Sequence, residues 1–250
     1  MTHAQTARGS FIVCNGYVVA ETTENTPPKF TRAKDDGTGY GSTNKVHLAG
    51  IGEWGDGSFT CFAVDDAAQD YLVTLRDAGT SVWWKFVRPS TWMSAGVATP
   101  FRTDKTYGFV SGWEYVGQKE GRATYKLTIT PEETVTTGIT TLGAALTTGF
   151  LAFTNQADEA ITAVSPTLSA TVYKYAVTAF SDDTGIKITP TATTGTIYVN
   201  GVQVASGAAS AAITIGTGTK TIYVMVVESD LKCPVIYQID VTKGTVASPT

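Results

Sequence analysis

The second half of the chain alternates apolar and polar residues over short runs, and this period of two is typical of β-strands. The runs are rich in Val, Ile, Thr and Tyr and are separated by residues that favour turns. They predict six strands, at Tyr173–Phe180, Ile186–Ala192, Thr196–Val204, Ala211–Ile215, Lys220–Glu228 and Val235–Lys243. Strands this short, each bounded by turn residues, predict a small antiparallel β-sandwich.

One turn of this region is specified by an Asn-Gly pair. Asn200-Gly201 lies between Val199 and Val202, and a type I′ turn needs two positive φ angles that Asn and Gly tolerate. We therefore expect a tight hairpin within Thr196–Val204. Pro234 should lie at the start or edge of the last strand, because proline cannot donate to a β-ladder.

The first half of the chain combines strands with one helical pattern. Ala68, Leu72 and Leu75 recur at helical spacing, with Asp65 as the predicted N-cap and Gly79 as the stop. Asp65–Gly79 is the predicted helix, packed on a sheet. The predicted strands around it lie at Gly9–Ala20 (one or two strands), Phe59–Val64, Ser81–Val87, Tyr107–Gln118 and Ala123–Thr130.

Between the first two strand regions lies a polar segment, Glu21–Asn44, rich in Thr, Pro, Gly and charge. It predicts a long loop or an extended hairpin. Because it is too long for a plain connection, we expect it to reach a neighbouring molecule. The candidate contacts are an apolar anchor and the residues around it: Phe30, Lys29, Arg32, Lys34, Asp35, Asp36 and Tyr40.

The composition of the chain changes near residue 135. All five Trp, both His and all six Arg lie before that point, whereas Thr, Ala, Val, Ile and Gly dominate after it. Such a shift indicates a domain boundary, which we place within Thr134–Asp158. We expect one domain over residues 1–140, a linker or edge strand over 141–157, and the sandwich over 158–250.

Overall composition limits the class of protein. The chain has 250 residues, 42% hydrophobic and 16% charged, with a mean hydropathy of +0.02, which is typical of a folded globular protein. A net charge of -4 argues against a protein that grips duplex DNA. No apolar stretch is long enough for a spanning helix, and no secretory signal follows the polar N-terminal residues. We therefore expect synthesis and assembly in the cytoplasm, without membrane contact.

Structural roles explain the residues that could otherwise be catalytic or metal-binding. His3 and His47 form no recognisable triad spacing, and the HExxH, GxSxG, Walker and GxGxxG motifs do not occur. The acid pairs are better explained by capping and turns than by metal binding: Asp35-Asp36, Asp65-Asp66 and Asp182-Asp183. Widely spaced Cys14, Cys61 and Cys233 predict buried thiols. We expect no enzyme, cofactor or metal.

Two adjacent tryptophans are candidates for an exposed aromatic contact. Side chains of neighbouring residues in a strand point to opposite faces, so at least one of Trp83 and Trp84 should face away from the main core. An aromatic ring on an outer face usually marks a subunit interface. Stacking on sugar is the alternative interpretation.

The second half of the chain resembles a known repeat. The run Thr196-Ile197-Tyr198-Val199-Asn200-Gly201, the turn Ser206-Gly207 and the closing Tyr237-Gln238-Ile239-Asp240-Val241 resemble the cadherin-like β-sandwich repeat of bacterial surface and phage proteins. The resemblance implies an immunoglobulin-like sandwich that serves as an adhesive or spacer module.

The first half resembles the tail tube protein of long-tailed bacteriophages. The resemblance rests on the element order, on Asp65–Leu72 as the family's helix, on Trp83–Phe86 as the strand after it, and on the hairpin of Phe109–Glu114 with Tyr125–Ile129. It implies a mainly β fold, with a tail-tube-like antiparallel β-sandwich or barrel and one α-helix, followed by the C-terminal immunoglobulin-like β-sandwich.

This resemblance also implies a function. Copies would form hexameric rings, stacked into a tail tube, with the tape measure and tail terminator proteins as further partners. DNA would pass through a neutral or acidic lumen without specific binding, and the second domain would project outside, where it touches cell-surface glycans weakly. The protein would reside in the virion tail. Three alternatives are a capsid decoration protein, a bacterial adhesin or carbohydrate-binding module, and an enzyme.

Overall fold

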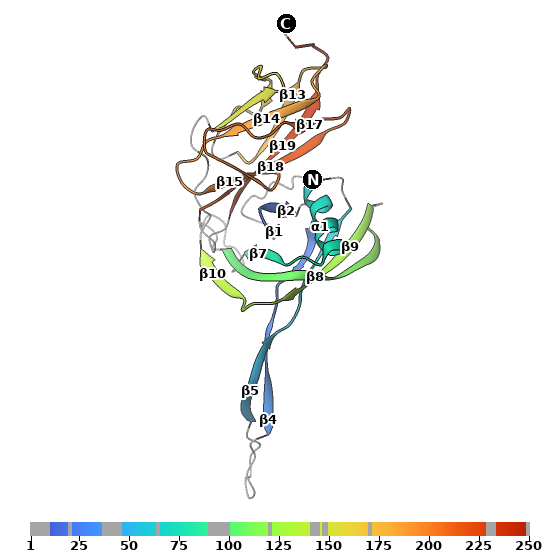
Figure 1. Ribbon diagram of the computed structural model, residues 1–250, viewed down its shortest axis with the longest axis vertical. Helices are drawn as coiled ribbons and strands as arrows, with labels where there is room; N and C mark the ends of the chain where they lie inside the picture. The colour runs from blue at the N-terminus through green and yellow to red at the C-terminus, as the bar shows by residue number, and fades with distance from the viewer. Residues whose placement is uncertain are drawn as a thin grey trace, which may run out of the picture.

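A computed structural model describes residues 11–19, 22–36, 47–63, 66–89, 101–119, 122–140, 146, 150–169, 172–228 and 234–248 (Figure 1). Strands dominate these ranges, and α1 (Ala67–Ala78) is the one helix within them. The mainly β class with a single helix is therefore confirmed.

Eight strands of the first half form one curled sheet, antiparallel throughout. Across this curl the side-chain amide of Asn25 donates to the carbonyls of Phe11 at 3.5 Å and Val87 at 3.3 Å, so the edge strand β3 lies next to β1. The strands that the structure describes close no barrel. The order is β2 (Tyr17–Val19), β1 (Phe11–Cys14), β7 (Val82–Pro89), β8 (Phe101–Lys119), β9 (Arg122–Pro131), β6 (Gly57–Phe62) and β3 (Thr22–Thr26), and β10 (Thr136–Thr140) also pairs with β8.

The N-cap of the helix is Asp66, one residue later than the predicted Asp65. Asp66 has an extended backbone, and its Oδ1 accepts a hydrogen bond of 2.8 Å from the backbone N–H of Gln69. An N-cap must be the last extended residue before the first turn, and here that residue is Asp66. Gly79 ends the helix with φ 61°, as predicted.

The helix and the sheet enclose the first core. Ala68, Leu72 and Leu75 are buried, as the helical spacing predicts. Leu72 and Leu75 pack with buried side chains of the sheet, among them Ile12, Cys14, Phe59, Trp84, Phe86, Leu127 and Ile129. Burial of this apolar surface is the dominant favourable contribution to folding of the unit.

The second half forms a sandwich of two sheets. One sheet has the order β11 (Leu151–Asn155), β14 (Gly185–Pro190) and β17 (Ile213–Thr214). The other has the order β12 (Val164–Ser165), β13 (Lys174–Ala179), β19 (Val235–Lys243), β18 (Lys220–Val227), β15 (Thr196–Val199) and β16 (Val202–Val204). All six predicted strand regions are present, and Pro234 directly precedes β19 as expected.

The sandwich confirms the predicted Asn-Gly turn but departs from a wholly antiparallel arrangement. Asn200 and Gly201 have φ angles of 44° and 80°, which confirms the tight turn between β15 and β16. The sandwich is not wholly antiparallel, however, because β13 pairs with β19 in parallel. Parallel neighbours are joined through other elements and not by a hairpin, so local turn signals do not reveal them.

The sheets also separate the segments around residue 140. β10 pairs with β8 of the first sheet, whereas Phe150 is buried in the sandwich core and β11 is an edge strand of the sandwich. Leu146 also belongs to that core, and its N–H donates to the hydroxyl of Tyr237 at 3.1 Å. We propose that the domain boundary lies between β10 and Leu146.

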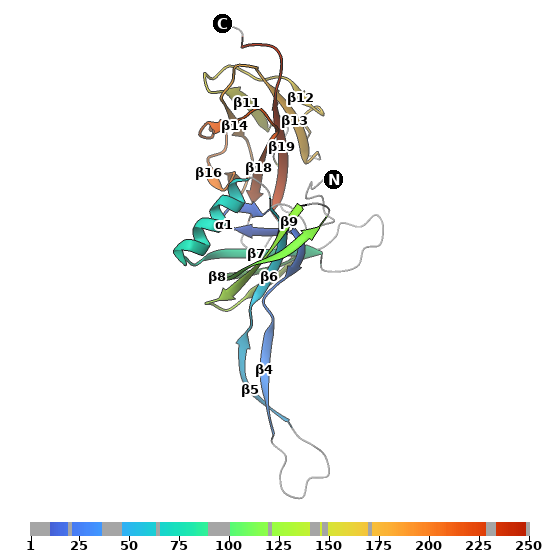
Figure 2. The ribbon, with the colours of Figure 1, turned by 90° about the vertical axis from the view of Figure 1, so that its right-hand side faces the viewer.

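The described part of the polar segment, residues 22–36, belongs mainly to paired strands, as the extended-hairpin alternative predicts. Its first part is β3, which pairs with β6, and its continuation is the antiparallel pair of β4 (Phe30–Asp36) and β5 (His47–Trp54). Figures 1 and 2 show β4 and β5 projecting from the sheet on the side opposite the sandwich. We refer to β4 and β5 as the ribbon.

The two units pack against each other through the outer face of β1. Phe11 and Val13 pack in one cluster with Met225 and Ile236 of the sandwich. Ile12, the residue between them, points into the first core. Both faces of β1 are therefore covered, which explains why its four residues are apolar without alternation.

Two Asn-Gly turns interlock at this interface. Asn15-Gly16 joins β1 to β2 with φ angles of 43° and 91°, so it is a second hairpin turn of the same kind as Asn200-Gly201. A Cβ at Gly16 would lie 2.6 Å from the ring of Tyr198, and a Cβ at Gly201 would overlap the ring of Tyr17. Each turn thus packs a tyrosine ring onto the glycine of the other turn.

Gly201→Ala should therefore destabilise the protein more than Gly207→Ala. Both glycines have similar positive φ angles, 80° and 77°, so the backbone strain of alanine is matched. Only at Gly201 would the methyl group meet a ring, and Tyr17 cannot retreat without breaking its stacking on Tyr71 at 4.4 Å. The expected difference in the free energy of unfolding, measured with urea, is about 1–3 kcal/mol. Equal losses would contradict the interlock.

Candidate interaction surfaces

The described residues assemble no metal centre and no reactive thiol. They contain no group of three or more His, Cys, Asp or Glu side chains that could hold a metal ion. Cys14 and Cys61 are buried, as predicted, and burial raises the pKa of Cys14 well above its usual value and that of Cys61 to about 12. Both thiols therefore remain protonated at neutral pH. Cys233 and His3 lie outside the described residues.

Membrane contact through a helix has no support in the described ranges. None of their helical segments combines the length and apolar character that a membrane span requires.

One face of the ribbon carries an aromatic cluster. Phe30 pairs with Trp54 across the strands, and their ring centroids are 5.2 Å apart. The guanidinium of Arg32 lies 5.6 Å from the Phe30 ring centroid. Gly52 makes room for this ring, because a Cβ at that position would overlap it. Even so, Phe30 is 43% exposed.

The other face of the ribbon presents an isolated apolar side chain. The register shifts between Arg32 and Lys34, so Ala33 opposes two residues, Gly50 and Ile51. A bulge of this kind bends and twists a strand pair. Ile51 is 90% exposed at this bulge.

Both outer edges of the ribbon are unpaired by the described part of the chain. β4 and β5 form a sheet of two strands, separate from the other sheets. A lone two-stranded hairpin is marginally stable in water, and unpaired strand edges are templates for pairing with another chain. The ribbon therefore has the properties of a segment that a partner completes.

The structure places most of the predicted contact residues on this ribbon. Lys29 is exposed directly before β4, and Phe30 and Arg32 are exposed within it. Lys34, Asp35 and Asp36 belong to the same strand, although the structure describes only their backbone. Tyr40 lies outside the described residues. The role of these residues as subunit contacts stays a prediction.

The two adjacent tryptophans separate as the strand geometry requires. Trp83 is 40% exposed and packs edge-on against Tyr107, with ring centroids 5.3 Å apart. Trp84 is fully buried, and its indole N–H donates to the carbonyl of Gly108 at 2.9 Å. The prediction of Trp84 as an exposed contact is wrong, because α1 and the curled sheet enclose its face of β7.

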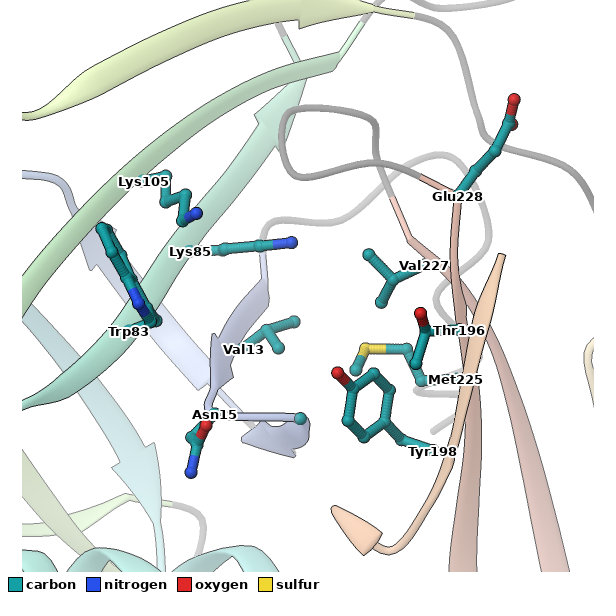
Figure 3. A pocket seen from close by; sticks show the side chains of 11 residues that line it. Val13, Asn15, Trp83, Lys85, Lys105, Thr196, Tyr198, Met225, Val227 and Glu228 are labelled. Carbon is teal, nitrogen blue, oxygen red and sulfur yellow. The ribbon is translucent and has the colours of Figure 1, made fainter. Parts of the chain in front are cut away.

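A cleft of about 320 Å³ lies where the two units meet (Figure 3). Trp83, Lys85 and Lys105 line it from β7 and β8. Sequence patterns did not indicate it, because its two walls come from segments about 100 residues apart. The sandwich contributes the facing side chains, which are Thr196, Tyr198, Met225, Val227 and Glu228.

Comparison with known families identifies the C-terminal region. Residues 159–244 match the family model of the cadherin-like beta sandwich domain. The match spans β12 to β19 and agrees with the resemblance carried by the closing strands. The C-terminal region is therefore a cadherin-like β-sandwich domain.

No curated protein matched the chain. Three solved structures are similar in part. The first is an anti-feeding prophage baseplate, with 9% identity over 52% of this chain and 90% of that chain and a TM-score of 0.40. The second is the virion of a native gene transfer agent particle, with 14% identity, 48% and 87% coverage and a TM-score of 0.37. The third is the tail of an empty gene transfer agent particle, with 14% identity, 53% and 96% coverage and a TM-score of 0.40.

Alanine substitution should destabilise the protein more at Trp84 than at Trp83. Trp84→Ala removes a fully buried ring and its hydrogen bond, and it should lower the free energy of unfolding by about 3–5 kcal/mol. Trp83→Ala removes a half-exposed ring with Lys105 Nζ 3.9 Å from its centroid, and it should cost about 1 kcal/mol. Urea denaturation of both variants measures the difference. Similar losses would show that the two faces of β7 are buried alike.

Proposed function

We propose that the chain is a structural subunit of a virion tail, the major tube protein, whose copies form stacked hexameric rings around a lumen for DNA. The observation that carries this proposal is the ribbon. It projects from the sheet, it has two unpaired edges, and it exposes apolar surface at Phe30 and Ile51. A neighbouring copy that covers the ribbon would pair its free strand edges and bury its exposed apolar side chains.

The edges of the main sheet support assembly of the same kind. β2 and β3 end the sheet, and β8 beyond Gly108 pairs only with β9 among the described strands. A ring of identical copies satisfies such edges by symmetry, since each copy offers the same edge to the next. An open row of copies would leave one unpaired edge at each of its two ends.

The placement of the cadherin-like domain is compatible with ring formation. The domain and the ribbon lie at opposite ends of the molecule (Figures 1 and 2). The ribbon can therefore engage neighbouring copies without displacing the domain, which we place on the outside of the tube. There it is available for weak contact with cell-surface glycans, summed over many copies.

The charge of the chain suits a conduit for DNA. A net charge of -4 gives phosphate groups no general attraction to the subunit. DNA would therefore slide through the lumen without specific binding. The partners of the subunit would be further copies and other tail proteins, such as the tape measure and tail terminator, and the chain itself would be no enzyme.

Ile51→Asp should prevent tube assembly without destabilising the monomer. Ile51 is 90% exposed, so the monomer loses little burial, whereas a carboxylate in a subunit contact lacks a partner. Negative-stain electron microscopy over a concentration series should show rings or tubes of uniform bore for the unchanged chain and none for this variant. Val246→Asp is the matched control, because Val246 is 70% exposed on the sandwich, and this variant should assemble.

Monodisperse monomers of the unchanged chain at every concentration would overturn the tube proposal. A glycan array would then test whether the chain is a carbohydrate-binding module, and binding to capsids would test whether it is a decoration protein.

A further inference from the structure

Two Asn-Gly pairs occupy turns of the same kind in this molecule, at Asn15-Gly16 and at Asn200-Gly201. The asparagines have φ angles of 43° and 44°, and the glycines have φ angles of 91° and 80°. Each pair joins two antiparallel strands by a two-residue turn. The backbones of the two pairs are therefore closely matched, and a difference in their reactivity has to come from the asparagine side chains and their surroundings.

An asparagine that precedes glycine can lose its side-chain amide without an enzyme. The backbone nitrogen of the glycine gives its proton to hydroxide and attacks Cγ of the asparagine. The Cγ–Nδ2 bond then breaks, ammonia leaves with a proton taken from water, and a five-membered succinimide ring remains. Water opens this ring at one of its two carbonyls, which gives aspartate or isoaspartate. Glycine favours the attack because it has no Cβ beside the nitrogen, but Cγ of the asparagine must be free to turn toward that nitrogen.

The side chain of Asn200 is held in a position that opposes this attack. Its Oδ1 accepts a hydrogen bond of 2.9 Å from the backbone N–H of Tyr223 on β18. The backbone N–H of Asn200 donates to the carbonyl of the same residue, also at 2.9 Å. Cγ cannot rotate toward Gly201 until the bond to Oδ1 breaks, and one such bond shifts an equilibrium by up to about tenfold.

The side chain of Asn15 is held less firmly by the described part of the chain. Asn15 is exposed, and its amide is directed away from the sandwich wall in Figure 3. Its Nδ2 donates a hydrogen bond of 2.9 Å to the hydroxyl of Tyr71, and this bond is exposed to water. Water can replace an exposed partner, so this bond opposes rotation less than the backbone bond of Asn200 does.

We propose that Asn15 is a site of spontaneous deamidation, whereas Asn200 keeps its amide in the folded protein. The co-reactant is water, and the products are ammonia and a turn that contains aspartate or isoaspartate at residue 15. The reaction needs no enzyme, so the modified fraction rises with the age of the protein.

The isoaspartyl product changes the turn between β1 and β2. It carries the main chain through the side-chain carbon, so the backbone gains one atom within the turn. A two-residue turn that pairs Cys14 with Tyr17 cannot accommodate this atom and also keep Gly16 packed on the ring of Tyr198. Deamidation therefore loosens one of the contacts between the sheet and the sandwich.

Peptide mapping by mass spectrometry of the full chain, incubated at mildly alkaline pH, measures both sites in one sample. In the folded chain, Asn15 should lose its amide about tenfold faster than Asn200, because only Asn200 has its side-chain carbonyl bound to a strand. The chain unfolded in guanidinium chloride is the matched control, and there the two rates should agree. Equal rates in the folded chain, faster loss at Asn200, or no loss at Asn15 while the unfolded chain reacts would refute the proposal.

Asn15→Gly tests the consequence for stability. This variant has no side-chain amide to lose, and glycine adopts a φ of 43° readily. Once Asn15 is largely converted to isoaspartate, the Tm of the unchanged chain should have fallen by about 2–4 °C. The Tm of Asn15→Gly should be the same before and after the same incubation. A converted chain with an unchanged Tm would contradict the loosened contact, and neither measurement depends on tube assembly.

Discussion

β1 is buried on both of its faces, and the arrangement of the rest of the molecule depends on that burial. Ile12 and Cys14 point into the core beneath α1, whereas Phe11 and Val13 point into the cluster shared with the sandwich. A strand of four apolar residues in a sheet with one wet face would leave half of them in water. Docking of the sandwich removes that cost, because Phe11 and Val13 are buried against Met225 and Ile236.

The docking of the sandwich on the sheet shapes the cleft but does not reach the ribbon. The interlocked turns set the separation of β7 and β8 from β15 and β18, and this separation gives the cleft its two walls. At the other end of the molecule, the described part of the chain gives the ribbon no such support. Among the described residues, the sandwich end of the molecule is therefore covered by its own chain, whereas the ribbon keeps two unpaired edges.

Lys85 lies at a covered position of the cleft, directly opposite Lys105 on the neighbouring strand. A cross-strand pair of lysines opposes stable pairing of β7 and β8, and a covered position for Lys85 adds a desolvation cost.

The sequence alone determined the features that local geometry controls. The strands of the sandwich followed from alternation, the turn at Asn200-Gly201 from its two positive φ angles, and the burial of Leu72 and Leu75 from helical spacing. The opposite orientations of Trp83 and Trp84 followed from the strand period, but which of them is buried was decided by where α1 packs. The tertiary structure alone decided the parallel pairing of β13 with β19 and the cleft. These features join residues distant in the chain, and no periodicity within one segment encodes which distant surface will cover it.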